Sequence, residues 1–259
     1  MEDHRNNLPA RGLGDILNET FAIYGKHFRR LLAMVAIVQV PASLLTLITN
    51  GGMATFVIVG LLSALAAGAC AYAGVVFAVG QHYLTGEVDI SACYVRVWGR
   101  IASLLTLAVV LAVVTGLGLL LAVIVVPAFV MIVVMVYWSL SSQAVVVEGR
   151  KPLDALKRSF RLVQGSWWRV FGITVVLLLV LLGLGLVLAA PFALASRLVA
   201  PDGNTVSGTA FEYLSGLIIA VTVPPPLAIA TTLLYYDLRV RKENYDFNAL
   251  SREMGRALV

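Results

Sequence analysis

The stretch VFGITVVLLLVLLGLGLVLAAP, residues 170–191, decides the fold class. It carries 15 Leu, Ile, Val or Phe side chains and no Asp, Glu, Lys or Arg. At roughly −0.3 to −0.6 kcal/mol for each such residue at a helix centre, these side chains contribute on the order of −5 to −9 kcal/mol to membrane insertion. A helix of about 20 apolar residues crosses the hydrocarbon core of a bilayer. The stretch is therefore predicted to be a transmembrane helix.

Charged residues are also absent from long intervals elsewhere in the chain. None occurs for 56 residues after Arg30, for 47 residues after Arg100 or for 27 residues after Arg169. The first two intervals are long enough for two spans each. The pattern predicts an all-α polytopic integral membrane protein, with residues 1–259 as a single domain. Its six spans, arranged as three hairpins, are predicted at about residues 31–49, 55–79, 101–124, 129–147, 170–191 and 211–235.

The basic residues indicate how these spans are oriented. Of the 19 Lys and Arg residues, all but Arg197 fall on one side of the predicted arrangement. Basic loops stay in the cytoplasm, so both termini are predicted to be cytoplasmic. The net charge of +5 is then a sign of membrane topology, and we expect no nucleic-acid partner.

Three segments on the basic side have apolar residues at helical spacing. The first runs from Leu13 to Phe28, the second from Ile90 to Ile101 and the third from Leu153 to Trp167. Each is predicted to be an amphipathic helix at the membrane surface, preceding one hairpin; the alternative is a solvated loop. The first and third also align at a constant offset of 139 residues, which indicates an internal repeat. The aligned residues are Asp15, Leu17, Thr20, Phe21, Ile23, Phe28 and Arg30 with Asp154, Leu156, Ser159, Phe160, Leu162, Trp167 and Arg169.

The third segment is also the candidate binding surface. Basic side chains interleaved with aromatic ones favour contact with anionic lipid headgroups on the cytoplasmic side, although docking onto a protein partner is the alternative. The residues predicted to form this surface are Arg150, Lys151, Lys157, Arg158, Arg161, Trp167 and Arg169.

The run Pro224-Pro225-Pro226 is predicted to break the sixth span, because each proline removes a backbone donor. Broken helices line substrate sites in many transporters, whereas a purely structural kink is the plainer interpretation. The apolar cores carry no ionisable residue, and the sequence holds no recognisable catalytic motif, metal-ligand spacing or cofactor motif. We therefore expect no catalytic, metal or cofactor site.

Three segments of the sequence resemble the bacterial membrane-domain family named after glycerophosphoryl diester phosphodiesterase. They are LGDILNETFAIYGKHFRRLL (13–32), EGRKPLDALKRSFRLVQGSWWRVFGI (148–173) and LLYYDLRVRKENYDF (233–247). The resemblance implies a location in the bacterial cytoplasmic membrane. It implies the membrane module alone, because the catalytic barrel needs about 250 residues of alternating strands and helices, and its His-Arg-Gly signature is absent here.

These observations favour a non-enzymatic membrane module that anchors, scaffolds or regulates a partner. A transporter of small molecules or lipids is the alternative, supported by the repeat and the proline run. The membrane part of a glycerophosphodiester phosphodiesterase system is a third possibility, supported by the resemblance alone.

Overall fold

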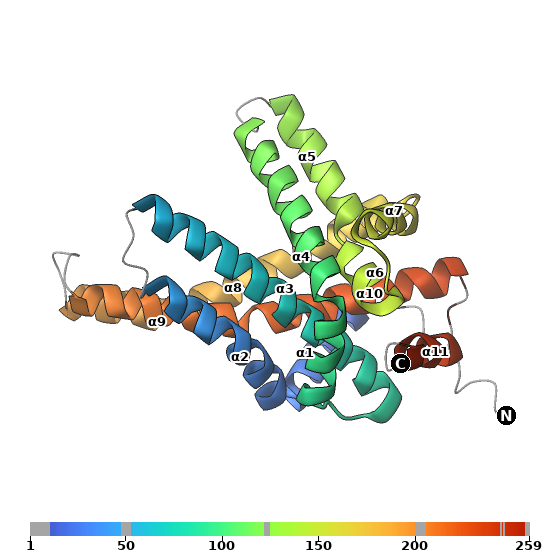
Figure 1. Ribbon diagram of the computed structural model, residues 1–259, viewed down its shortest axis with the longest axis horizontal. Helices are drawn as coiled ribbons and strands as arrows, with labels where there is room; N and C mark the ends of the chain where they lie inside the picture. Colours follow the sequence, from blue (N-terminus) through green and yellow to red (C-terminus); the bar gives the residue numbers. More distant parts are fainter. Residues whose placement is uncertain are drawn as a thin grey trace.

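The computed structural model describes residues 11–47, 53–121, 125–199, 206–243, 245 and 247–256. Within these residues the chain forms helices only (Figure 1). They are α1 (Leu13–Lys26), α2 (Phe28–Leu47), α3 (Met53–Thr85), α4 (Ile90–Leu121), α5 (Val125–Trp138), α6 (Ser141–Glu148), α7 (Pro152–Val163), α8 (Trp167–Val199), α9 (Val206–Thr222), α10 (Pro224–Glu243) and α11 (Phe247–Arg256).

Six segments of the described chain are long and apolar enough to cross a membrane, which confirms the predicted all-α polytopic fold. They are Phe28–Leu45, Leu62–Thr85, Ile90–Leu117, Phe129–Glu148, Trp167–Val199 and Ala210–Glu243. Residues 48–49 and 122–124 of the predicted first and third spans lie outside the described residues. So do residues 1–10 and 257–259, and with them the two predicted cytoplasmic termini.

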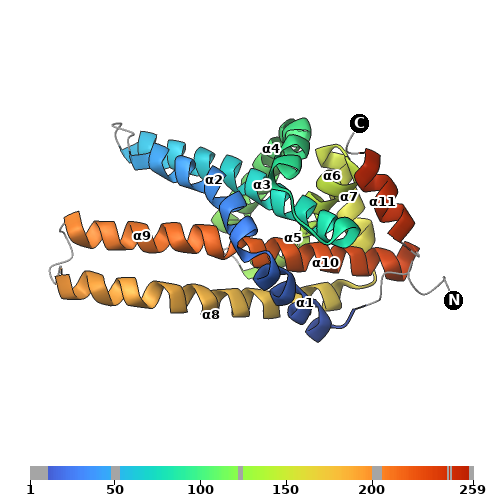
Figure 2. The same ribbon diagram turned by 90° about the horizontal axis from the view of Figure 1, so that it is seen from below.

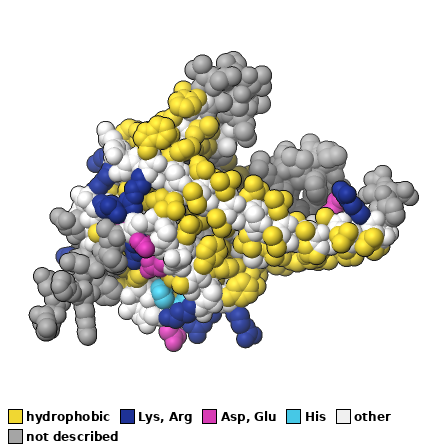
Figure 3. All heavy atoms as spheres, turned by 180° about the vertical axis from the view of Figure 1, so that it is seen from behind, with side chains coloured by type: hydrophobic (Ala, Val, Ile, Leu, Met, Phe, Trp, Pro, Cys, Tyr) yellow, Lys and Arg dark blue, Asp and Glu magenta, His cyan; other side chains and the backbone are white. Residues whose placement is uncertain are grey.

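The three hairpins diverge from a common base. The α2–α3 and α8–α9 hairpins extend toward the same side, whereas the α4–α5 hairpin splays away from them (Figures 1 and 2). α6, α7 and α11 lie at the base, beside the second half of α10. Lys and Arg side chains gather over this base, and the hairpins are covered mainly by hydrophobic side chains (Figure 3).

α10 is the central element of the base. Every residue from Ala228 to Arg239 is buried, and α10 contacts α1, α2, α3, α7, α8 and α9. Apolar side chains on all sides of a helix are typical of a fully enclosed position. Charged groups on this buried part of α10 therefore need partners inside the protein.

The predicted repeat has a structural counterpart in α1 and α7, which both pack against α10. Thr20 and its equivalent Ser159 are each fully buried, and Phe21 and its equivalent Phe160 are 40 % and 42 % exposed. The two helices thus bury the same face at the same register.

The second predicted surface helix is not a separate element. Residues 90–101 form the first turns of α4, which continues without a break to Leu121. Asp89 caps its start by accepting bonds from the backbone N–H of Ser91 (2.9 Å) and of Ala92 (3.4 Å). No proline or turn interrupts the helix beyond this cap, so surface segment and span merge.

Two predicted spans are each divided into two helices. The fourth breaks at Ser139 and Leu140, between α5 and α6. Ser159 of α7 bridges this break, because its hydroxyl donates to the carbonyl of Tyr137 (2.6 Å) and accepts from the Leu140 N–H (3.2 Å). The break therefore leaves neither backbone group without a partner.

The break in the sixth span confirms the expectation from the proline run. α9 ends at Thr222, and Pro224, Pro225 and Pro226 form the first turn of α10. Proline is well tolerated there because the first N–H groups of a helix have no intrahelical partner. The Tyr24 hydroxyl donates to the carbonyl of Thr222 (3.0 Å), which links α1 to the end of α9.

Candidate functional site: the basic face at the base of the helices

The base holds a neutral, largely buried ion network that we call the Glu148 cluster. It joins α6, α7, α10 and α11. Its members are Glu148, Arg150, Arg158, Tyr235, Arg239, Glu243, Tyr245 and Glu253.

Glu148 is the centre of this cluster, with a side chain only 7 % exposed. The Nε of Arg158 donates to both of its carboxylate oxygens, at 2.8 and 3.1 Å. Arg150 and the hydroxyl of Tyr235 donate to it as well. A buried carboxylate needs such partners, because an unpaired buried charge is strongly destabilising.

Arg158 and Arg239 connect the cluster to the end of α10 and to α11. Arg158 also pairs with Glu243, through an Nη2–Oε2 bond of 2.7 Å. Arg239 donates two hydrogen bonds, of 2.7 and 2.9 Å, to the carboxylate of Glu253 on α11. Its guanidinium also lies 3.7 Å from the ring centroid of Tyr245. Burial lowers the pKa of Arg158, but hydrogen bonds from its guanidinium to Glu243 and Glu148 outweigh this effect and raise it. Arg158 therefore stays positively charged.

A second set, the Asp237 cluster, lies on another side of α10. Asp237 is fully buried and accepts from the backbone N–H of Arg11 (2.7 Å), from Arg169 (2.6 Å) and from Arg241 (3.0 Å). The Arg11 guanidinium in turn pairs with Glu19 and donates a hydrogen bond to the hydroxyl of Tyr83 (3.1 Å). The full set is Arg11, Glu19, Tyr83, Arg169, Asp237 and Arg241. It joins the start of α1 to α3, α8 and α10.

These contacts divide the predicted basic surface into two groups. Arg150, Arg158 and Arg169 each pair with an internal carboxylate, so the structure does not leave them available to a surface ligand. Trp167 is the first residue of α8 and stacks on Phe171, with ring centroids 5.0 Å apart. The remaining predicted residues are exposed on and beside α7: Lys151, Lys157 and Arg161.

The exposed face of α7 borders a groove of about 730 Å³. We call it the α7 groove. Its lining residues are Trp138, Leu153, Leu156, Lys157, Phe160 and Arg161. It is thus an apolar surface with two cations along it.

A second hollow, which we call the α3–α4 crevice, lies between two of the diverging hairpins. It has a volume of about 650 Å³, and most of its walls are apolar. An added Cβ at Gly68 or at Gly116 would meet nothing within 4 Å, so these glycines leave space and do not serve close helix packing. At one end Tyr72 bonds to Thr231 of α10 (2.5 Å) and to Gln143 of α6 (2.6 Å). The three prolines of α10 do not line it.

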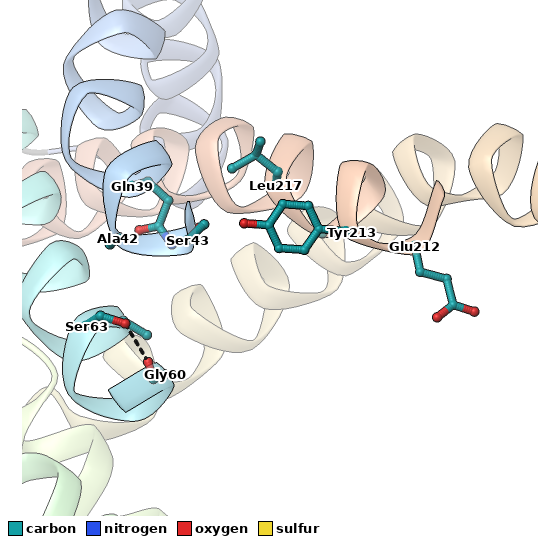
Figure 4. A pocket seen from close by; sticks show the side chains of 10 residues that line it. Gln39, Ala42, Ser43, Gly60, Ser63, Glu212, Tyr213 and Leu217 are labelled. Atoms are coloured by element: carbon teal, nitrogen blue, oxygen red, sulfur yellow. Dashed lines mark hydrogen bonds between the residues drawn. The ribbon is translucent and has the colours of Figure 1, made fainter. Parts of the chain in front are cut away.

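A smaller cavity of about 300 Å³ lies between α2, α3 and α9. Figure 4 shows the Tyr213 hydroxyl directed toward Gln39 and Ser43, whereas the Glu212 carboxylate points away from them. Ser63 already donates to the carbonyl of Gly60 (3.0 Å). Among the described residues, no charged group therefore converges on this cavity.

The described part of the chain contains no cluster of side chains that could bind a metal ion. No three His, Cys, Asp or Glu side chains lie close enough there to hold a metal ion. His27 and His82 form a pair, with Nε2 and Nδ1 3.0 Å apart, and no carboxylate among the described residues completes a ligand set around them.

Comparison with known proteins places the chain in a family. A family model matches residues 22–237, from α1 to the central part of α10. The chain belongs to the family described as Domain of unknown function (DUF7847). No curated protein and no solved structure shows significant similarity to the chain. The matched region includes Glu148, Arg158 and Asp237, but the partners Glu243 and Glu253 lie beyond it.

Proposed function

We propose that this protein is a non-enzymatic membrane module that holds a helical platform at the cytoplasmic surface of the membrane. The platform consists of α1, α6, α7, α11 and the second half of α10. The Glu148 cluster is the observation that carries this proposal. Its three carboxylates and three guanidinium groups neutralise one another, which is the arrangement expected of a structural network that rigidifies a surface.

The distribution of basic residues supports the orientation. Lys and Arg gather at the base (Figure 3), and Arg197 near the end of α8 is the one basic residue assigned to the opposite side. Basic segments remain in the cytoplasm. We therefore place the platform inside the cell, facing the anionic headgroups of the cytoplasmic leaflet.

Thiol labelling in intact cells tests the orientation. In a variant lacking Cys70 and Cys93, a cysteine replacing Asn204 should react with an impermeant reagent, and one replacing Asp154 of α7 should not. Equal labelling at the two positions would contradict the proposal.

An activity assay tests the non-enzymatic part, including the link to phosphodiesterases that the family resemblance implies. The purified chain should not hydrolyse glycerophosphodiesters above background. Hydrolysis that a point substitution in this chain abolishes would overturn the proposal, because it would place an active site within the module.

The α3–α4 crevice supports lipid handling as a second candidate function. A long apolar hollow in the spanning region suits an acyl chain, and its lining spans about 12 residues of α4, or roughly 18 Å at 1.5 Å per residue. Filling it with Gly68→Leu and Gly116→Leu should reduce the lipid that copurifies with the protein. Gly183→Leu is the matched control, since Gly183 lies on α8 and has similar free space around it. Equal lipid retention in both variants would remove this candidate.

A further inference from the structure

α7 separates its basic residues onto two faces. The side chain of Arg158 is only 12 % exposed and is held by Glu148 and Glu243. Lys157 and Arg161 lie on the exposed side, and neither has an ion pair or side-chain hydrogen bond within the described chain. Arg158 therefore fixes the inward face of α7 to the rest of the base, while the outward face carries two cations without an ion-pair partner among the described residues.

The α7 groove beside these cations has an apolar floor. Leu153 is 66 % exposed, and Phe160, 42 % exposed, stacks on Tyr137 with ring centroids 4.5 Å apart. Trp138 closes the groove from the end of α5. Its volume of about 730 Å³ falls in the range of roughly 300–1,000 Å³ that is usual for small-molecule sites.

The electrostatics of the groove favour an anion. Lys157 and Arg161 are four residues apart on one helix, where like charges repel each other. Asp154, in the first turn, is the one carboxylate on α7, and Glu148 is already engaged on the buried side. A phosphate between the two cations would remove their repulsion, and an attached hydrocarbon chain would cover the floor.

We infer that the α7 groove binds an anionic phospholipid of the bilayer. Its phosphate lies between Lys157 and Arg161, and one acyl chain lies along Trp138, Leu153 and Phe160. Free phosphate would leave the floor uncovered, so the combination of charge and apolar surface points to a lipid. The inference rests on the proposed position of α7 at the cytoplasmic leaflet. Trp138 at the end of α5 fits that level, because tryptophans are enriched at membrane interfaces.

Fluorescence quenching in the reconstituted full-length chain tests this site. Trp98, Trp167 and Trp168 are replaced by Phe, which leaves Trp138 as the single reporter. The protein is placed in phosphatidylcholine vesicles that contain chain-brominated phosphatidylglycerol or, at equal mole fraction, chain-brominated phosphatidylcholine. The anionic lipid should quench Trp138 more strongly, and added salt should reduce the difference.

Charge variants locate the preference. In Lys157→Gln/Arg161→Gln the preference for the anionic lipid should fall by about fivefold for each charge removed, since a basic residue at an anionic surface is worth ~1 kcal/mol. The matched control Lys26→Gln/Arg29→Gln removes two exposed charges outside the groove and should keep the preference. Leu153→Asn, at a mostly exposed position, should lower quenching by both lipids because it shortens the apolar floor.

The outcomes separate this inference from the proposed function. Equal quenching by the two brominated lipids overturns the lipid site and leaves an acidic protein segment as the occupant of the groove. The orientation of the protein is tested separately by thiol labelling. An undiminished preference in the Lys157/Arg161 variant also overturns it. Thermal unfolding of every variant shows whether the base remains folded.

Discussion

Replacing Glu148 by Gln should destabilise the whole base of the protein. The substitution keeps the size of the side chain and removes its charge. Arg150, Arg158 and Tyr235 then lose a charged acceptor. The Nε of Arg239 lies 3.9 Å from the same carboxylate. Three guanidinium groups would remain close together with one carboxylate fewer to neutralise them.

The expected magnitude follows from burial. Breaking a buried ion pair by removing one partner costs about 3–5 kcal/mol. At about 2–4 °C per kcal/mol for a chain of this size, the midpoint of thermal unfolding should fall by on the order of 10 °C. The comparable exposed pair is Arg30–Glu87, whose side chains are 49 % and 78 % exposed. Glu87→Gln should therefore cost no more than about 1 kcal/mol.

A thiol-reactive fluorophore provides the assay in detergent micelles, with the partly exposed Cys70 replaced by Ala in every protein. Cys93 is fully buried and reacts when the helices separate. Both variants and the parent are heated under identical conditions. If Glu148→Gln unfolds at the same temperature as Glu87→Gln, the cluster does not stabilise the base, and the structural account of it is wrong.

Two further substitutions test individual joints. Ser159→Ala should lower the free energy of unfolding by about 1–3 kcal/mol, because two backbone groups at the α5–α6 break lose a partner. Ser63→Ala removes a hydrogen bond within one helix and should lower it much less. Equal losses in the two variants would contradict the bridge assigned to Ser159. Burial, and then the neighbouring His82, lowers the pKa of His27, so the unfolded chain binds a proton there more readily than the folded one. Stability should therefore decrease as the pH falls below about 6.5, and the decrease between about pH 7.5 and pH 5.5 should be smaller in His27→Gln. An identical pH dependence in the two proteins would show that this pair does not contribute.

Much of the fold was predictable from the sequence because the membrane imposes a simple rule. A run such as residues 170–191 has no stable location except the hydrocarbon core, and α8 contains this whole run in one continuous helix. The proline run also acts locally, because each ring excludes a hydrogen bond at a known position. The spans and the helix break at Pro224 can therefore be predicted from the local sequence alone.

The α5–α6 break was missed because it depends on a contact with another part of the chain. The break at Ser139 is supported by Ser159, 20 residues away, and no proline marks it. In the same way, the interleaved charges around α7 indicated a basic surface, but not that Arg158 would turn inward. Its partner Glu243 lies 85 residues further along the chain, and spacing within α7 contains no information about that pairing.

The signal for the buried clusters was present in the segment LLYYDLRVRKE, residues 233–243. It places Asp237 and Arg239 directly after a strongly apolar run, where they continue a helix that is buried on all sides. Charges next to an enclosed helix require internal partners. The identity of those partners, Arg169 for Asp237 and Glu253 for Arg239, came only from the structure.

The most direct test of the account is the depth of α7 in the membrane. Nitroxide spin labels are attached to cysteines that replace Leu153 in the groove or Gln164, which is exposed just after α7, in the protein reconstituted into vesicles containing phosphatidylglycerol. Collisions with oxygen and with a water-soluble nickel chelate measure the depth of each label. We expect the label at residue 153 to lie below the headgroup phosphates and the label at residue 164 to lie in water. Equal accessibility of both labels to the nickel chelate would show that α7 does not rest on the membrane, which contradicts the central claim.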